Sequence, residues 1–262
     1  MLTKKLKGLI IASTVAASAL LSTFTVQADD LKSIQDAKEI RIAMSGQYAP
    51  FSFANEQNQV VGFDASISEA LAERLGVKVK IITTPFDGII AGLRANKYDA
   101  IIASTTITPE RLKAVDFVGP YYRAGRTIVV REDSPIKSLD DLKNVSVGVT
   151  LGDAHDKWAR ERGNLKVKSY KGLPEMLVDL DAGRLDALVM DSVPVLVAVK
   201  KTGQKVRIIT PPDSEGGIED MGIALRKNNP ELKAALQQAL ADILADGTYE
   251  KISMEWIGSD IR

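Results

Sequence analysis

Two stretches far apart in this chain of 262 residues follow one pattern, and this internal repeat constrains the fold more than any other feature. The first is Lys97–Ile102, KYDAII, and the second is Arg184–Val189, RLDALV. Each follows a helical segment and opens an apolar strand. Five residues beyond each aspartate stands a polar residue, Ser104 in the first copy and Asp191 in the second. The repeat predicts two similar α/β lobes that each present a polar side chain where a strand ends, the place where open α/β sheets bind ligands.

Apolar strands alternate with amphipathic helices along the chain, which is the pattern of an α/β fold. Ile40–Met44 and Val77–Ile82 are predicted to be strands, and Asp64–Leu75 is predicted to be the helix between them. Asp64 is placed to cap this helix, the apolar residues of the helix share one face, and Gly76 ends it. The first lobe therefore begins as a strand, a helix and a strand.

A second lobe is predicted to begin near Thr127, with Val145–Thr150 as its first interior strand and Val206–Thr210 as its last. The proline and glycine pairs within residues 211–217 indicate a return crossing, after which the long helix from Pro230 completes the first lobe. Two crossings between lobes make a hinge. The predicted units are residues 1–28 as a signal peptide, residues 29–125 and 219–262 as lobe 1, and residues 126–218 as lobe 2.

A hydroxyl-rich loop leads from the first repeat into a helix start. Thr108, Pro109 and Glu110 supply a capping threonine, a proline at the first helical position and an acid in the first turn. Arg111 lies in the same turn, where the helix dipole disfavours a cation by roughly 0.3 to 1 kcal/mol. A ligand carboxylate bound by the guanidinium and by nearby backbone N–H groups would offset this cost, so the segment predicts a site for a small anion. The alternative is a surface ion pair of Arg111 with Glu110 or Asp116.

The N-terminus has the pattern of a secretory signal peptide. Lys4, Lys5 and Lys7 precede a short apolar stretch, and cleavage is expected after Ala28. An uncleaved membrane anchor is the alternative, although the stretch is short and rich in alanine for a membrane span. The chain has no cysteine, and so neither a lipid-anchor cysteine nor a disulfide. We expect a soluble protein of the bacterial periplasm.

Charge and histidine content exclude other classes of function. Cleavage removes three of the 34 basic residues and none of the 34 acidic ones, which leaves a net charge near −3. No broad basic surface follows, and this argues against nucleic-acid binding. His155 is the only histidine, which excludes a histidine-based metal centre and argues against a catalytic triad. We predict no cofactor and no metal, and we place His155 on the exposed first turn of a helix beside Asp153.

Eight short motifs occur in order along the mature chain. They are Tyr48-Ala49-Pro50-Phe51, Gly62-Phe63-Asp64, Phe86-Asp87-Gly88, Tyr98-Asp99-Ala100, Ile107-Thr108-Pro109-Glu110-Arg111, Asp116-Phe117, Pro120-Tyr121-Tyr122 and Asp246-Gly247-Thr248-Tyr249. With them the chain resembles the amino-acid-binding members of the periplasmic solute-binding proteins, which deliver polar amino acids to ABC importers. The resemblance implies the type II fold of this class: two lobes, each a mostly parallel sheet flanked by helices, joined by a two-strand hinge that closes around the ligand.

The resemblance also implies ligand contacts from both lobes. Arg111 would bind the α-carboxylate, assisted by the backbone N–H of Thr106 and by the amide of Ala154. Asp191 would bind the α-ammonium, with Ser104 and the Thr106 hydroxyl as further acceptors. A zwitterion needs one fixed cation and one fixed anion, because burying either charge unpaired costs several kcal/mol.

Further positions bear on the ligand side chain. Tyr48 and Phe86 match the aromatic residues that sandwich this side chain in such proteins; the alternative for each is core packing. Ser45 stands where members that favour basic side chains often carry an aspartate. Asp153 replaces a small Ser or Thr, and it either reaches the ligand or caps the following helix, two roles that are compatible. For Asp191 the alternative role is also a helix cap.

These inferences favour a monomeric periplasmic receptor that binds one polar L-amino acid between its lobes and delivers it to an ABC transporter permease. Glutamine and cystine fit the pattern as well as basic amino acids do. One alternative is an enzyme similar to the cyclohexadienyl dehydratases, with Asp153 as its general acid. Another alternative is a ligand sensor for a membrane signalling protein.

Overall fold

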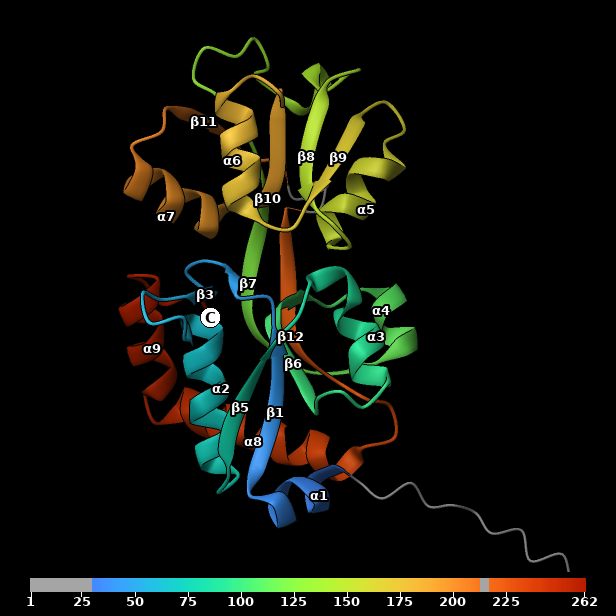
Figure 1. The fold of residues 1–262 in the computed structure, drawn as a ribbon, viewed down its shortest axis with the longest axis vertical. Coiled ribbons are helices and arrows are strands. Elements are labelled where there is room, and N and C mark those ends of the chain that lie inside the picture. The colour runs from blue at the N-terminus through green and yellow to red at the C-terminus, as the bar shows by residue number, and fades with distance from the viewer. Residues whose placement is uncertain (1–29, 213–216) are drawn as a thin grey trace, which may run out of the picture.

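The computed structural model describes residues 30–212 and 217–262. The expected signal peptide lies outside the described residues, as do residues 213–216 of the expected return crossing. The described chain forms two α/β lobes, one above the other along the long axis of the molecule (Figure 1). Within these ranges no helix has both the length and the apolar character that crossing a membrane would require.

Strands and helices alternate along the described chain, as the sequence predicts. In chain order the elements are α1 (Asp30–Ala37), β1 (Glu39–Met44), β2 (Gln47–Tyr48), β3 (Ser52–Ala54), β4 (Val60–Val61), α2 (Phe63–Arg74), β5 (Lys78–Thr83), η1 (Phe86–Gly88), α3 (Ile89–Arg94), β6 (Ala100–Thr106), α4 (Pro109–Ala114), β7 (Asp116–Arg131), η2 (Leu139–Asp141), β8 (Ser146–Thr150), α5 (Ala154–Glu161), β9 (Lys166–Tyr170), α6 (Leu173–Asp181), β10 (Ala187–Asp191), α7 (Ser192–Thr202), β11 (Val206–Ile209), β12 (Ile218–Leu225), α8 (Pro230–Ala245) and α9 (Thr248–Trp256). The strands predicted around residues 40–44, 77–82, 145–150 and 206–210 are confirmed to within one residue at each end.

The lower lobe in Figure 1 is built on a mostly parallel sheet. Strand β1 pairs in parallel with β5 and β6, and β12 then pairs antiparallel to β6. Helices α2, α8 and α9 lie on one side of this sheet, and α3 and α4 lie on the other (Figure 1). Apolar residues from the sheet and from α8 form one core, including Ile42, Ile101 and Leu240, each at most 1 % exposed.

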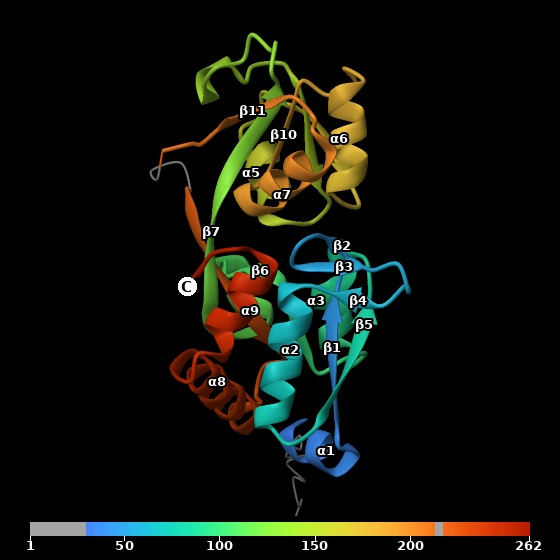
Figure 2. The same cartoon turned by 90° about the vertical axis from the view of Figure 1, so that its left-hand side faces the viewer.

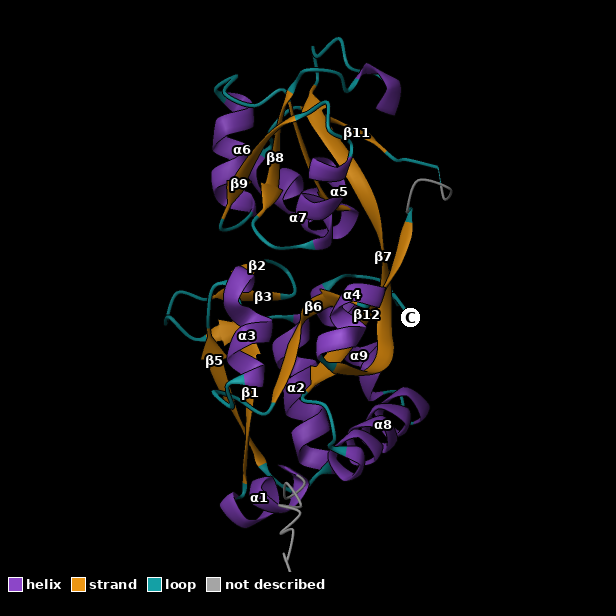
Figure 3. Ribbon diagram, turned by 90° about the vertical axis from the view of Figure 1, so that its right-hand side faces the viewer, coloured by secondary structure: helices purple, strands orange, loops and turns teal. Residues whose placement is uncertain are grey.

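The upper lobe repeats this arrangement. Strand β8 pairs in parallel with β9 and β10, and β7 pairs antiparallel to β10 and β11. Neighbouring residues of β7 point to opposite faces, as in any strand. Ile128 and Val130 therefore enter the core on one face, which also contains Ala159 of α5, whereas Val129 enters the core that contains Leu177 of α6. The elements of this lobe are seen from two further sides in Figures 2 and 3.

Two long strands join the lobes. Strand β7 begins in the lower lobe and ends in the upper one, and β12 pairs with it antiparallel from Ile218↔Gly125 to Leu225↔Asp116 (Figure 2). The sheets of both lobes are therefore continuous through this strand pair. The expected lobe boundaries at 125/126 and 218/219 fall within it and stay a prediction.

The aspartates of the internal repeat have the same structural role in both lobes. The backbone N–H of Asp99 donates to the carbonyl of Arg41 at 2.8 Å, and Asp99 Oδ2 accepts from the Arg41 N–H at 2.8 Å. Asp186 makes the same pair of bonds with Ser146, at 2.9 and 2.7 Å. Each aspartate fixes the start of a central strand against its parallel neighbour. The polar residues five positions on are thereby carried to corresponding ends of β6 and β10.

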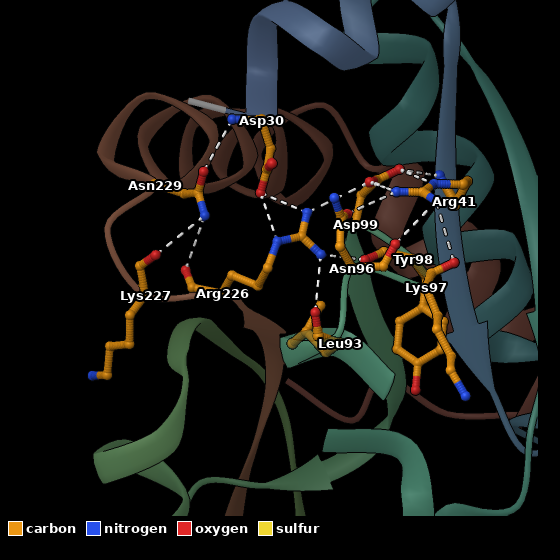
Figure 4. Close-up of polar contacts among 10 residues, drawn as sticks. All are labelled: Asp30, Arg41, Leu93, Asn96, Lys97, Tyr98, Asp99, Arg226, Lys227 and Asn229. Carbon is orange, nitrogen blue, oxygen red and sulfur yellow. Dashed lines mark hydrogen bonds and ion pairs between the residues drawn. The ribbon is translucent and has the colours of Figure 1, made fainter. Parts of the chain in front are cut away.

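A network of charged residues lies at the far end of the lower lobe (Figure 4). Arg226, which follows β12, donates to Asp30 at 2.6 and 3.0 Å and to the Leu93 carbonyl at 3.1 Å. Arg41 pairs with Asp99 at 2.6 Å. These bonds tie α1 and the end of β12 to the central strands, so we assign them a structural role.

The predicted helix cap of α2 is wrong. Gly62 occupies the N-cap position, with φ of 126°, and the helix begins at Phe63. A Cβ at Gly62 would lie 2.5 Å from the carbonyl oxygen of Phe51, so only glycine fits this entry to the helix. Asp64 instead lies fully buried inside the lobe.

Candidate functional site

A cavity of about 480 Å³, its open mouth included, lies between the two lobes. Its lining includes all eight residues that the sequence predicts as ligand contacts: Tyr48, Phe86, Ser104, Thr106, Arg111, Asp153, Ala154 and Asp191. Six further lining residues were not predicted as contacts: Ser45, Gln47, Thr150, His155, Lys171 and Gly172. The structure therefore brings the predicted residues together from both lobes.

The lobes touch each other around this cavity. The Tyr48 hydroxyl of the lower lobe donates to Asp191 of the upper lobe. Arg111 Nη2 of the lower lobe donates to the Gly152 carbonyl of the upper lobe at 3.3 Å. The structure therefore represents a closed arrangement, in which residues of facing lobes contact one another directly.

Arg111 is held at the start of α4 as the sequence predicts. The Thr108 hydroxyl accepts from the Arg111 backbone N–H at 3.1 Å, and Pro109 opens the helix. Arg111 Nη1 donates to the Thr106 carbonyl at 2.8 Å, and the guanidinium lies 5.5 Å from the centroid of the Phe86 ring. The ring and the carbonyls fix the guanidinium in the cavity wall without forming an ion pair with it.

The alternative of a surface ion pair for Arg111 is wrong. Glu110 pairs with Lys157 across the cleft, and Asp116 pairs with Lys227 at 2.7 Å. Within the residues that the structure describes, Arg111 has no carboxylate within 4 Å. A cation in the wall of a cavity without a counterion is a binding site for an anion.

Asp191 supplies the opposite charge from the end of β10. It stands at the N-cap position of α7, but its side chain makes no capping bond, so the alternative role as a side-chain cap is wrong. Its carboxylate accepts from the Tyr48 hydroxyl and lies 3.3 Å from His155 Nε2, and the residue is 4 % exposed. A carboxylate has about four acceptor positions, so it retains capacity for a ligand ammonium.

The prediction that His155 is exposed is wrong. The residue is 4 % exposed, because the first turn of α5 points into the cleft rather than to solvent. Its Nδ1 accepts from Arg126 Nε at 3.2 Å, so Nε2 carries the hydrogen that is directed at Asp191. His155 therefore orients the carboxylate of Asp191.

Arg126 and Glu219 support His155 from the hinge strands. Arg126 Nη2 pairs with Glu219 Oε1 at 2.7 Å, and the Arg126 guanidinium lies 4.9 Å from the centroid of the Trp158 ring. Glu219 Oε2 also accepts from the Thr106 hydroxyl at 3.5 Å. Residues of β7 and β12 thus contact both halves of the site. The sequence gives no local signal for these contacts, because they depend on the pairing of two strands that lie far apart in the chain.

Asp153 caps α5, which confirms one of the two roles expected for this residue. Its Oδ1 accepts from the Asp156 backbone N–H at 2.7 Å. The same residue lines the cavity, and burial raises the pKa of its carboxyl to about 6. Ala154 follows at the first helical position, where its backbone N–H belongs to the free amides at a helix N-terminus.

Ser104 is held in an unusual conformation by a buried carboxylate. Its φ of 52° lies in the left-handed region, next to a register shift between β6 and β12. The Ser104 hydroxyl donates to Asp64 Oδ2 at 2.8 Å, and the Tyr121 hydroxyl donates to Asp64 Oδ1 at 2.7 Å. Because the hydroxyl hydrogen of Ser104 points to Asp64, the oxygen presents its lone pairs to the cavity. Burial raises the pKa of Asp64 to about 6 against these hydrogen bonds.

Replacing Asp64 with asparagine is expected to weaken amino-acid binding without lowering stability. Ser104 and Tyr121 donate to different oxygens of Asp64, and an amide replaces one of these oxygens with an NH2 donor, so it cannot accept both bonds in this geometry. We expect the Kd to rise about tenfold near pH 7.5, which is about 1.4 kcal/mol. The melting temperature should stay equal or rise, because a buried charge is removed. Calorimetric titration that gave an unchanged Kd would contradict this role of Asp64.

The Asp64→Asn variant also tests how stability and ligand binding depend on pH. The folded-state pKa of about 6 lies above the ordinary 3.8, so the stability that Asp64 contributes is present at low pH and is lost as the pH rises through about 6. A ligand ammonium interacts better with the ionised carboxylate, so the Kd should fall as the pH rises through the same window. Asp153 titrates there too, and so the difference between wild type and Asp64→Asn is the quantity to measure.

Thr150 is a lining residue that sequence reasoning missed. Its hydroxyl oxygen is buried and has no hydrogen-bond partner among the described residues. A buried hydroxyl without a partner costs free energy, so a polar ligand atom in this cavity would stabilise it. The only sequence signal was its place at the end of β8, which corresponds to the strand ends that carry Ser104 and Asp191.

Comparisons with known proteins agree with this geometry. The model of the bacterial extracellular solute-binding proteins, family 3, matches residues 40–259. The chain is 34% identical over 254 residues to the L-cystine-binding protein TcyJ of Escherichia coli (strain K12), with 94% of each chain covered. It also matches the crystal structure of an ancestral amino acid-binding protein, a precursor of cyclohexadienyl dehydratase, with a TM-score of 0.80 and 37% identity over 87% of this chain and 99% of that one. An ancestral arginine-binding protein bound to glutamine matches with a TM-score of 0.79 and 40% identity, covering 85% of this chain and 99% of that one. The predicted two-lobed fold is thereby confirmed.

Proposed function

Because the chain belongs to the bacterial extracellular solute-binding proteins, family 3, we propose that it is the periplasmic substrate-binding component of an ABC importer for a polar L-amino acid. One observation carries this proposal. An arginine without a counterion in the described chain and a buried aspartate face the same cavity from opposite lobes. This pair matches the two charges that every α-amino acid carries, whatever its side chain.

The proposed contacts follow from the geometry of the walls. Arg111 binds the α-carboxylate, with the amides of Thr106 and Ala154 as further donors. Asp191 and the Ser104 oxygen accept from the α-ammonium. A micromolar affinity needs about −8 kcal/mol. Over some ten heavy atoms this is about −0.8 kcal/mol per atom, within the range that compact ligands reach when closure excludes water.

We propose binding rather than catalysis. The relatives are named as binding proteins, and the structural neighbour that relates to a dehydratase is itself an amino acid-binding protein. Asp153, with its pKa raised to about 6, is the general-acid candidate in the lining, but one of its oxygens is engaged in capping α5.

We further propose that the receptor is a monomer, that the N-terminus directs it to the periplasm, and that an ABC permease is its membrane partner. A pull-down from membranes would distinguish this permease from a signalling protein as the partner.

A thermal-shift screen tests this function. The ligand-stripped mature protein is screened against the twenty L-amino acids, L-cystine and common opines, because a ligand that binds only the folded state raises its melting temperature. We expect a large shift for one or a few polar amino acids and none for their D-enantiomers. Prephenate and arogenate are included, and their products are measured. Turnover of either compound, or no shift with any amino acid, would contradict the proposal.

A further inference from the structure

Arg126 and Asp191 are directly paired residues of neighbouring strands. Strands β7 and β10 run antiparallel, with Arg126 opposite Asp191. Side chains at such positions share one face of the sheet, with Cβ atoms about 4.5 to 5.5 Å apart. Two residues further along each strand, Ile128 and Val189 enter the core that contains Ala159 of α5, so this is the face that α5 covers. A cation and an anion placed in this way are expected to form an ion pair.

The structure does not form this ion pair. Among the described residues, Asp191 accepts from Tyr48 and lies 3.3 Å from His155 Nε2. Arg126 Nη2 pairs instead with Glu219 Oε1 at 2.7 Å. The His155 ring enters from the first turn of α5, and its Nδ1 accepts from Arg126 Nε at 3.2 Å. Because Arg126, His155 and Asp191 are each 4 % exposed, one imidazole ring separates the cation from the anion in the interior.

The contact with Arg126 fixes the charge of His155. A guanidinium can only donate hydrogen bonds, so Nδ1 is an unprotonated acceptor and the ring is neutral, with its hydrogen on Nε2. The hydroxyl of Tyr48 is neutral as well. Asp191 therefore receives a hydrogen bond from each of two neutral groups, and its negative charge stays available to a cationic group of a ligand.

We propose that His155 is a positioning residue that keeps Arg126 from pairing with Asp191 and so reserves this carboxylate for the α-ammonium of the ligand. In the receptor function proposed above, on which this inference rests, that ammonium binds Asp191. The His155 ring acts as a spacer: it passes a hydrogen bond to the carboxylate but no charge. Glu219 supplies the anion that Arg126 pairs with instead.

Removing the spacer is expected to weaken binding, and removing the charge of Arg126 as well is expected to restore part of it. In His155→Ala the guanidinium can reach Asp191, so the Kd should rise roughly 30-fold or more. Arg126→Gln lacks the charge and keeps an amide that can donate to Glu219. Alone it should raise the Kd, but added to His155→Ala it should lower the Kd about fivefold, whereas two structural losses would add. Arg94→Gln, an exposed arginine outside the cavity, is the matched control and should change neither Kd.

The pH dependence of binding provides a second readout. Burial lowers the pKa of His155, but Asp153 and Asp191 raise it above its ordinary value against the opposing charge of Arg126. As the pH falls through this pKa, the imidazolium becomes a charged partner of Asp191, so the Kd should rise. His155→Gln keeps a neutral donor that does not titrate, so it should lose this part of the pH dependence. Asp64 and Asp153 titrate in both proteins, and the difference between the two profiles is the quantity to measure.

Nitrogen-15 NMR observes the spacer directly, because His155 is the only histidine of the chain. In protein without a histidine tag at pH 8, we expect one protonated and one unprotonated ring nitrogen. Ligand binding should move the titration of His155 to lower pH, because the ammonium competes with the imidazolium for Asp191. A doubly protonated ring at pH 8 would overturn the neutral spacer.

Calorimetric titration at pH 8 with the twenty L-amino acids and L-cystine identifies the tightest ligand of the wild type, which then serves as the probe for all variants. A double variant that binds this probe no better than His155→Ala overturns the role of His155 and leaves the receptor function in place. Failure of every probe to bind the folded wild type overturns the receptor function and the inference together. Melting temperatures establish that each variant is folded, and His155→Gln and the wild-type NMR spectrum test the spacer without a truncated side chain.

Discussion

Replacing Arg111 with alanine is expected to abolish measurable amino-acid binding while leaving the protein folded. The side chain supplies the cationic wall of the cavity, and its charge has no counterion among the described residues. Its removal leaves a ligand carboxylate buried without a cation, which costs about 3 to 5 kcal/mol. This corresponds to a rise in Kd of roughly two to four orders of magnitude. Calorimetric titration with the amino acid that gives the largest thermal shift measures it.

Two companion variants make the result specific. Arg111→Lys retains the charge but loses the planar fork, so we expect an intermediate Kd. Arg94→Ala removes an exposed arginine of α3 outside the cavity and should bind like the wild type. The melting temperature of unliganded Arg111→Ala should change little, because Thr108 still caps α4. An Arg111→Ala protein that bound its ligand as tightly as wild type would refute the carboxylate site.

Most of the fold could be predicted from sequence because its determinants are local or repeated. Strand periodicity, the threonine and proline at the start of α4, and the two aspartates of the repeat each specify structure within a few residues. The repeat also carries the central site prediction. Asp99 and Asp186 make the same backbone bonds to a neighbouring parallel strand, so Ser104 and Asp191 reach corresponding strand ends.

The errors concern residues whose environment depends on the assembled lobes. Asp64 has the residue type and position of a helix cap, but Gly62 takes that place and the carboxylate turns inward to two hydroxyls. His155 lies on a first turn that would be exposed in an isolated lobe, and it is buried because that turn enters the cleft against Arg126 of the hinge. Local sequence patterns contain no information on packing between segments so far apart. The roles of the site residues stay predictions until binding is measured.

Closure of the lobes depends on a contact that only glycine permits. Gly172 stands at the start of α6 in the upper lobe and faces the small sheet that carries Gln47 and Tyr48. A Cβ at Gly172 would lie 2.9 Å from the carbonyl oxygen of Gln47, closer than atoms can pack. The backbone there is extended, with φ of −170°, a conformation that any residue adopts without strain. A side chain at this position therefore leaves each lobe intact and obstructs their approach, and it also enters the wall of the cavity, which Gly172 lines.

Replacing Gly172 with leucine is expected to weaken ligand binding strongly by holding the lobes apart. Overpacking a closed contact costs about 1 to 3 kcal/mol, so the Kd should rise roughly 5- to 150-fold, with Gly172→Ala at the lower end. Small-angle X-ray scattering should show ligand-induced compaction for wild type and little for Gly172→Leu. Gly88→Ala is the matched control, because a Cβ there meets no atom within 4 Å. Since Arg111 and Asp191 lie on different lobes, a ligand held by both requires closure. Full affinity and full compaction in Gly172→Leu would therefore show that binding does not depend on this closed arrangement.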